Sequence, residues 1–132
     1  MAISKNLEIK INNDTAEFNE KFYVYQNDRG IDLYIKISIP KLQIGSRSVS
    51  MLSELEEAKA SVTILKPNGD VLGRQDLEII DDAVKFVIDK ELTNDLDEVG
   101  IYKMQFHLYD GEDNRITIPP VTFEVKALIG II

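Results

Sequence analysis

The chain has 132 residues, no cysteine and a formal net charge of −8, and 44% of its residues are hydrophobic. This length suits one domain with one core, and the hydrophobic fraction argues against disorder. The lack of cysteine excludes disulfides and thiolate sites, and the acidic balance argues against nucleic acid or an anionic membrane as a partner. With no membrane-length apolar run and no signal-peptide core, we expect synthesis in a cytoplasm.

Most of the chain alternates between apolar and polar residues, which is the pattern of half-buried strands. The clearest run spans 31–39 and ends at Pro40. The other predicted strands lie near 7–11, 22–25, 58–65, 71–80 with a kink near Gly73, 84–88, 101–109, and 116–127 with an interruption at Pro119-Pro120. Turn sequences separate them, and a helical turn capped by Asp89 is the main trace of helix. The pattern predicts an all-β fold: an immunoglobulin-like antiparallel β-sandwich of about eight strands, forming a single domain over residues 1–132.

Two segments depart from this pattern. Lys41–Glu57 is a long polar connection in which Ser53 and Glu56 fit a capping box. It is either a functional loop or a poorly ordered insertion, and the sequence leaves both open. The apolar end Leu128–Ile132 favours the N-terminal domain of a longer protein, with a terminal core strand as the alternative.

The segment from Asp97 to Gly111 carries the most specific local signal. Glu98, Gly100 and Tyr102 match the acid-x-Gly-x-Tyr pattern of a tyrosine corner, in which a buried hydroxyl bonds a nearby backbone group. Alternation then assigns two faces to the following strand. The inward face holds Tyr102, Met104, Phe106 and Leu108, and the outward face holds Ile101, Lys103, Gln105, His107 and Tyr109.

The sequence offers little catalytic chemistry. The only histidine, His107, cannot form a multi-histidine metal site, and no Gly-x-Ser-x-Gly motif or phosphate-binding glycine loop is present. We therefore expect no enzymatic activity and no cofactor. Acidic clusters could bind calcium, although none has EF-hand spacing and solvated turn carboxylates are the simpler interpretation. These clusters are Asp76, Glu78, Asp81 and Asp82; Asp95, Asp97 and Glu98; and Asp110, Glu112 and Asp113.

What remains is surface for binding partners. Tyrosine is enriched in interfaces because it brings area with little loss of entropy. The candidate partner-binding residues are Tyr34, Lys103, Gln105, His107 and Tyr109. An alternative from another class is a carbohydrate- or ligand-binding module of a cell-surface or adhesin type. In that case Tyr23, Tyr34 or Tyr109 would form a stacking platform.

The order of several motifs is similar to a known family. They are the Asp28-Arg29-Gly30 turn, the Lys66-Pro67-Asn68-Gly69 turn, the Val84-to-Ile88 strand, Gly100-x-Tyr102, Phe106-x-Leu108 before Asp110-Gly111, and the Ile116-Thr-Ile-Pro-Pro-Val-Thr-Phe-Glu-Val125 close. From about Leu7 to Ala127, the chain resembles the N-terminal domain of the upper baseplate proteins of long-tailed phages that infect Gram-positive bacteria. Lys41–Glu57 is longer and more polar than the family pattern.

The resemblance implies a structural role without enzymatic activity or cofactor. In that family the domain is an immunoglobulin-like sandwich that attaches the protein to the baseplate hub, around the distal tail protein. Downstream segments form a trimeric stalk and carry the receptor-binding proteins used in host attachment. The resemblance therefore implies a virion tail component, encoded by a phage or prophage, with baseplate proteins as partners and a homotrimeric full-length protein.

Overall fold

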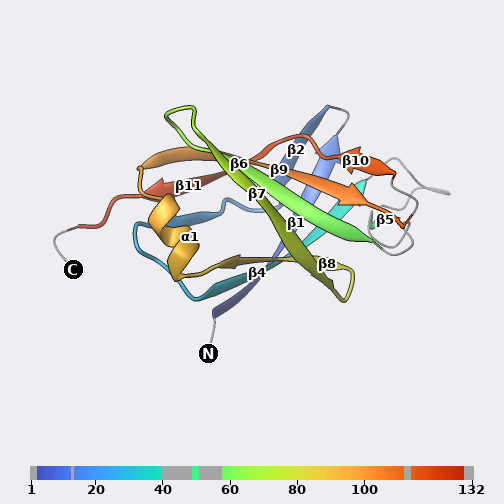
Figure 1. The fold of residues 1–132 in the computed structure, drawn as a ribbon, viewed down its shortest axis with the longest axis horizontal. Helices are drawn as coiled ribbons and strands as arrows, with labels where there is room; N and C mark the ends of the chain where they lie inside the picture. Colours follow the sequence, from blue (N-terminus) through green and yellow to red (C-terminus); the bar gives the residue numbers. More distant parts are fainter. Residues whose placement is uncertain (1–2, 13, 40–48, 51–57, 112–113, 130–132) are drawn as a thin grey trace.

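The computed structural model describes residues 3–12, 14–39, 49–50, 58–111 and 114–129 (Figure 1). The strands are β1 (Ile3–Asn12), β2 (Thr15–Phe18), β3 (Tyr23–Tyr25), β4 (Ile31–Ile39), β5 (Val49–Ser50), β6 (Lys59–Leu65), β7 (Val71–Ile80), β8 (Ala83–Ile88), β9 (Gly100–Tyr109), β10 (Arg115–Thr117) and β11 (Val121–Lys126). One short helix, α1 (Lys90–Asp95), lies between β8 and β9. The predicted all-β class is confirmed.

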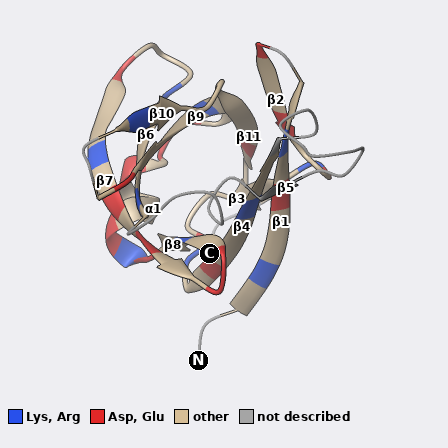
Figure 2. Ribbon diagram, turned by 90° about the vertical axis from the view of Figure 1, so that its right-hand side faces the viewer, with Lys and Arg blue, Asp and Glu red and all other residues tan. Residues whose placement is uncertain are grey.

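The strands form one connected sheet that curls round a core (Figure 2). The path runs β2-β1-β4-β8-β7-β6-β9-β11-β3, while β5 pairs with β4 and β10 pairs with β9. The pairs β1–β4 and β3–β11 are parallel. The prediction of an antiparallel sandwich of about eight strands was therefore wrong in two respects: the described residues form eleven strands, and the pairing is mixed. The immunoglobulin-like arrangement is not confirmed.

The sheet is continuous because β7 pairs with two neighbours in turn. Val71–Leu77 pairs with β6, and Glu78–Ile80 pairs with β8. The register with β6 shifts between Val62 and Ile64, opposite Gly73 and Arg74. An extra residue of this kind bends a strand and increases its twist. The irregularity falls near Gly73, where the sequence predicts a kink, and it precedes the change of neighbour between Leu77 and Glu78.

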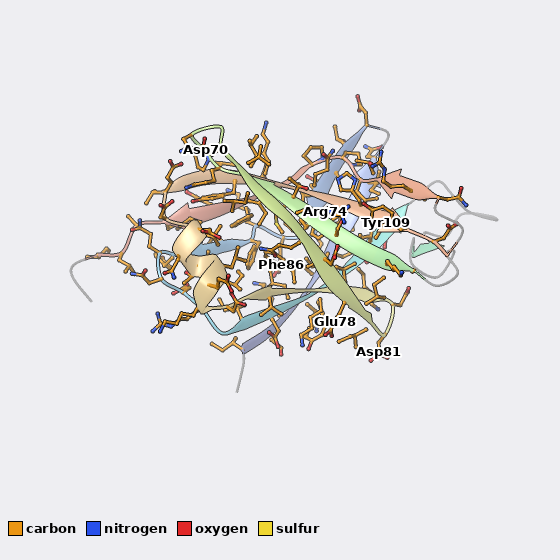
Figure 3. The ribbon with its side chains drawn as sticks, in the orientation of Figure 1. Asp70, Arg74, Glu78, Asp81, Phe86 and Tyr109 are labelled. Atoms are coloured by element: carbon orange, nitrogen blue, oxygen red, sulfur yellow. The ribbon has the colours of Figure 1, made fainter. Side chains whose placement is uncertain are left out.

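The core follows the alternation seen in the sequence. The predicted inward face of β9 is confirmed, since Tyr102, Met104, Phe106 and Leu108 are all fully buried. The Tyr102 ring stacks on Phe123 of β11, with 5.2 Å between the ring centroids. Figure 3 shows Phe86 inside the curl, between β8 and β7. Burial of these apolar side chains is the main force that closes the sheet on itself.

Helix α1 covers the end of the molecule where β7 and β8 separate (Figure 1). The Leu92 N–H donates to Asp89 Oδ1 at 2.8 Å, so the predicted cap is confirmed. Leu92 and Leu96 are buried in the core. Among the described residues, no helix is long and apolar enough to cross a membrane.

The end of the sheet at β3 is short and partly capped. The Tyr25 N–H donates to Asp28 Oδ2 at 2.9 Å, and the Asp28 N–H donates to the Tyr25 carbonyl at 3.1 Å. These bonds occupy both backbone groups of Tyr25 on the edge that faces away from β11.

The long connection from Lys41 to Glu57 lies outside the described residues except for Val49–Ser50. These two residues form β5, which pairs antiparallel with Ser38 and Ile39. The predicted capping box at Ser53 and Glu56 also lies outside the described part of the chain.

Candidate docking surfaces

The tyrosine corner forms as predicted. The Tyr102 hydroxyl donates to the Glu98 carbonyl at 2.9 Å and accepts from the Glu98 N–H at 3.1 Å. Gly100 has a φ of +143°, and a Cβ built there would lie 3.1 Å from the Pro67 side chain. The backbone conformation therefore favours glycine, and the close approach of Pro67 leaves little room for a Cβ.

The Lys66–Gly69 turn packs directly against this corner. Lys66 Nζ lies 2.7 Å from Asp97 Oδ1, and the Asn68 N–H donates to Glu98 Oε2 at 3.2 Å. The hydrogen bond between Lys66 and Asp97 raises the pKa of Lys66 and lowers the pKa of Asp97. Two of the motifs that carry the family resemblance are therefore one physical unit, which we call the corner junction (66–69 and 97–102).

Four of the five predicted partner-binding residues share the outer face of β9. Lys103 is exposed, and Gln105, His107 and Tyr109 are half-buried. The Tyr109 hydroxyl accepts from Arg74 Nη1 at 3.3 Å, and Figure 3 shows these two side chains side by side. The role of this face in binding stays a prediction.

His107 lies in a cationic environment on that face. Its Nδ1 is 3.0 Å from Thr117 Oγ1. Burial lowers the pKa of His107, and Arg115 and Arg74 lower it further. A catalytic base is normally oriented by a carboxylate, whereas the charges acting on His107 are cations. Ser61 is the residue opposite His107 on β6, and it is only 1% exposed. Its hydroxyl has no hydrogen-bond partner among the described residues, and its burial keeps it from a substrate.

Tyr34 does not join this face. It lies on β4, in a groove of about 350 Å³ that also includes Asn6, Glu8 and Lys36. In the sheet, β8, β7 and β6 separate β4 from β9. Tyr23 lies on β3 at the sheet's end, with its ring in edge contact with Tyr25 and Lys126 Nζ 4.1 Å from its centroid. The three tyrosines predicted as alternative stacking platforms therefore belong to three separate regions.

The predicted acidic clusters divide between local hydrogen bonding and an open groove. Asp97 and Glu98 belong to the corner junction, and Asp110 accepts hydrogen bonds from the Asn114 backbone and side chain. No group of three or more potential metal ligands is arranged for an ion among the described residues. Glu112 and Asp113 lie outside the described part, so the alternative of calcium at that cluster is not tested.

Three of the remaining acids, Asp76, Glu78 and Asp95, line an opening between β7 and β8, which we call the β7–β8 fork. It has a volume of about 460 Å³ and is lined by Gln75, Asp76, Leu77, Glu78, Lys85, Val87, Asp89, Glu91, Leu92 and Asp95. Five of these residues are carboxylates and one is a lysine. Two cations lie nearby: Lys85 Nζ is 3.9 Å from Asp32 Oδ2, and Arg74 Nη2 is 3.7 Å from Asp76 Oδ1. The carboxylates that line the opening therefore outnumber the cations near it.

The fork is hard to find from the sequence, because its acids lie in segments that are separate along the chain. A signal was available in Asp81-Asp82, which forms a two-residue turn with φ of +50° and +66°. Such a turn fixes the register of the hairpin and places Asp76 opposite Val87. The acids of β7 and those around α1 then line the same opening.

Comparison with known proteins shows what this fold is similar to. No family model matches this chain, and no curated protein matches it. Among solved structures, the N-terminal domain of phage TP901-1 ORF48 superposes with a TM-score of 0.58 and 11% sequence identity. The match covers 96% of this chain and 99% of that one. Identity this low shows a shared fold and carries no site residues with it.

Proposed function

We propose that this chain is a non-enzymatic docking module of a phage tail baseplate, which attaches a host-adhesion device to the baseplate core. The observation that carries the proposal is the fold shared, over nearly the full length of both chains, with the N-terminal domain of a phage protein. The motif resemblance of the sequence points in the same direction. Fold alone does not determine function, so the surfaces of the chain must supply the mechanism.

The corner junction and the sheet suit such a role. A docking module has to present a fixed surface, and a buried core with hydrogen-bonded crossings keeps a surface in one shape. The partner in this proposal is the distal tail protein of the baseplate hub. Receptor-binding proteins would attach through other segments of a trimeric full-length protein, and the site of action would be the virion tail.

The proposal is tested by binding to a purified distal tail protein. The domain is presented as a monomer and as a fusion to a trimeric coiled coil, because weak contacts gain strongly from multivalency. We expect the trimer to associate in size-exclusion chromatography with light scattering and in biolayer interferometry. Failure of the trimeric form to bind would overturn the proposal.

Matched charge reversals would locate the docking face. Lys103 is exposed on the outer face of β9, and Lys36 is exposed on β4. If the predicted β9 face docks, Lys103→Glu weakens binding and Lys36→Glu does not. If Lys36→Glu weakens binding and Lys103→Glu does not, the interface lies on the β4 side, and Lys103 is not a partner-binding residue.

A further inference from the structure

The β7–β8 fork contains two strand edges whose pairing stops while the strands continue. The ladder between them consists of Glu78–Lys85, Ile79–Val84 and Ile80–Ala83. The residues of β7 that precede Glu78 pair with β6 instead of β8, while β8 stays paired with β4. The two strands therefore diverge from a common hairpin, and Figure 1 shows them separating toward α1.

The backbone groups of Val87 point into this opening. On β8, the Ile88 carbonyl accepts from the Gly30 N–H at 2.8 Å, on the side of β4. Successive residues of a strand direct their backbone groups to opposite edges, so those of Val87 face β7. Lys85, two residues earlier, faces the same way and pairs with Glu78.

The backbone groups of Asp76 point into the opening from the other side. Asp76 lies two residues before Glu78, so its N–H and carbonyl face β8 by the same alternation. The ladder between β7 and β8 ends before Asp76 and Val87, which would be its next pair. Within the part of the chain that the structure describes, each strand thus has an edge without a ladder partner at this point, which is a template for an added strand.

The charge of the fork indicates the chemistry of such a strand. Asp76 and Glu78 lie on β7, Asp89 caps α1, and Glu91 lies in the first turn of the helix. All four are exposed. Their carboxylates surround the unpaired edges and would favour a segment carrying Lys or Arg. The exposed side chain of Val87 offers an apolar contact beside them.

We propose that the β7–β8 fork binds an extended, basic polypeptide segment of a partner protein by strand addition. The added strand hydrogen-bonds the free edge of β8 at Val87, and its alternate Lys or Arg side chains meet the carboxylates of β7 and α1. This inference rests on the proposed function, because it names a surface through which a docking module holds its partner.

The test uses synthetic peptides of about ten residues, which is long enough for one strand. The probe alternates lysine with threonine or valine. One comparison peptide replaces lysine with glutamate, and a second keeps the lysines but carries N-methyl groups that prevent strand pairing. Binding is followed by NMR titration of the ¹⁵N-labelled domain.

We expect the lysine probe to shift the amide signals of Asp76 and Val87 and to bind better than both comparison peptides. Glu78→Gln combined with Asp76→Asn should weaken binding about threefold to tenfold, the range expected for two exposed ion contacts. Equal binding of the N-methylated peptide would overturn strand addition. Shifts spread over the surface, without a maximum at the fork, would overturn the site.

A backbone variant separates the edge from the charge. Val87→Pro removes the N–H that faces the fork, while Val87→Thr keeps it with a similar side-chain shape. We expect loss of probe binding for Val87→Pro and near-normal binding for Val87→Thr. If Val87→Pro does not fold, the N-methylated peptide makes the same distinction on the unaltered domain.

These experiments separate the inference from the proposed function. A domain that binds the distal tail protein but not the lysine probe keeps the proposed function and loses the fork. If the domain binds the probe at the fork but does not bind the distal tail protein, the fork is a peptide-binding site and the proposed function is overturned.

Discussion

The corner junction and the β7–β8 fork use polar groups in opposite ways. At the corner, the polar groups are bonded to one another. Glu98 forms hydrogen bonds with Tyr102 and Asn68, and Lys66 forms an ion pair with Asp97. At the fork, carboxylates surround two strand edges where the ladder has stopped. The contrast teaches that polar residues in loops and edges can either secure a scaffold or remain open for a partner. Mutations at the two places should therefore have different consequences.

The largest effect is expected from Gly100→Ala. A Cβ at this position meets the Pro67 side chain at 3.1 Å in a backbone conformation that side chains rarely adopt. We expect a loss of about 2 kcal/mol or more in the free energy of unfolding, measured by urea denaturation. Gly73→Ala is the matched control, because no atom lies within 4 Å of its Cβ. Equal losses for both variants would contradict a special role for Gly100.

A smaller loss is expected from Tyr102→Phe. This change removes both hydrogen bonds to Glu98 but keeps the ring stacked on Phe123. We expect a loss of about 1 to 2 kcal/mol, with the fold and the binding by folded protein retained. Tyr25→Phe, at a 41% exposed tyrosine, should change stability little. A binding loss without a stability loss would mean that the corner itself contacts the partner.

A pH-dependent effect is expected from Asp97→Asn. Lys66 lowers the pKa of Asp97 in the folded state, so the pair stabilises the fold above the ordinary aspartate value of 3.8. That stabilisation is lost as the pH falls through the lowered pKa. The variant should therefore be less stable than the wild type near neutral pH, and the difference should shrink toward pH 3. Urea denaturation across this range measures it, and a constant difference would contradict the ion pair as its source.

The smallest effect on stability is expected at the fork. Asp76→Asn and Glu78→Gln remove exposed carboxylates that have other carboxylates nearby. The free energy of unfolding should change by less than about 0.5 kcal/mol in either direction, because the lost contacts with Arg74 and Lys85 offset the relief of repulsion between carboxylates. Thermal unfolding of the single variants checks this. A large destabilisation would show that the fork acids support the fold, as the corner residues do.

The sequence supported reliable predictions wherever a signal was local. Alternation placed Tyr102 and Phe106 in the core, and the acid-x-Gly-x-Tyr pattern located the corner. Which strand pairs with which is not encoded by a local signal. Alternation is the same in a strand with a parallel or an antiparallel neighbour, so the parallel pairing of β1 with β4 could not be predicted from it. β2 was missed because its four residues have at most partial burial.

The candidate surfaces were predictable to a similar degree. The residues of the outer β9 face share a strand, and alternation was enough to group them. Tyr34 was grouped with them only by residue type, and its distance from β9 depends on strand order. The fork depends on β7 changing neighbours, which no single stretch of sequence encodes.

The capped end of the sheet at β3 affects how the protein meets other copies of itself. A free sheet edge tends to recruit the same edge of another copy and to start aggregation. Here the final strand has three residues, and Asp28 occupies both outward backbone groups of Tyr25. The chain's own turn therefore opposes self-association at Tyr25. A second copy would have to break these two bonds before it could pair with Tyr25 at this end.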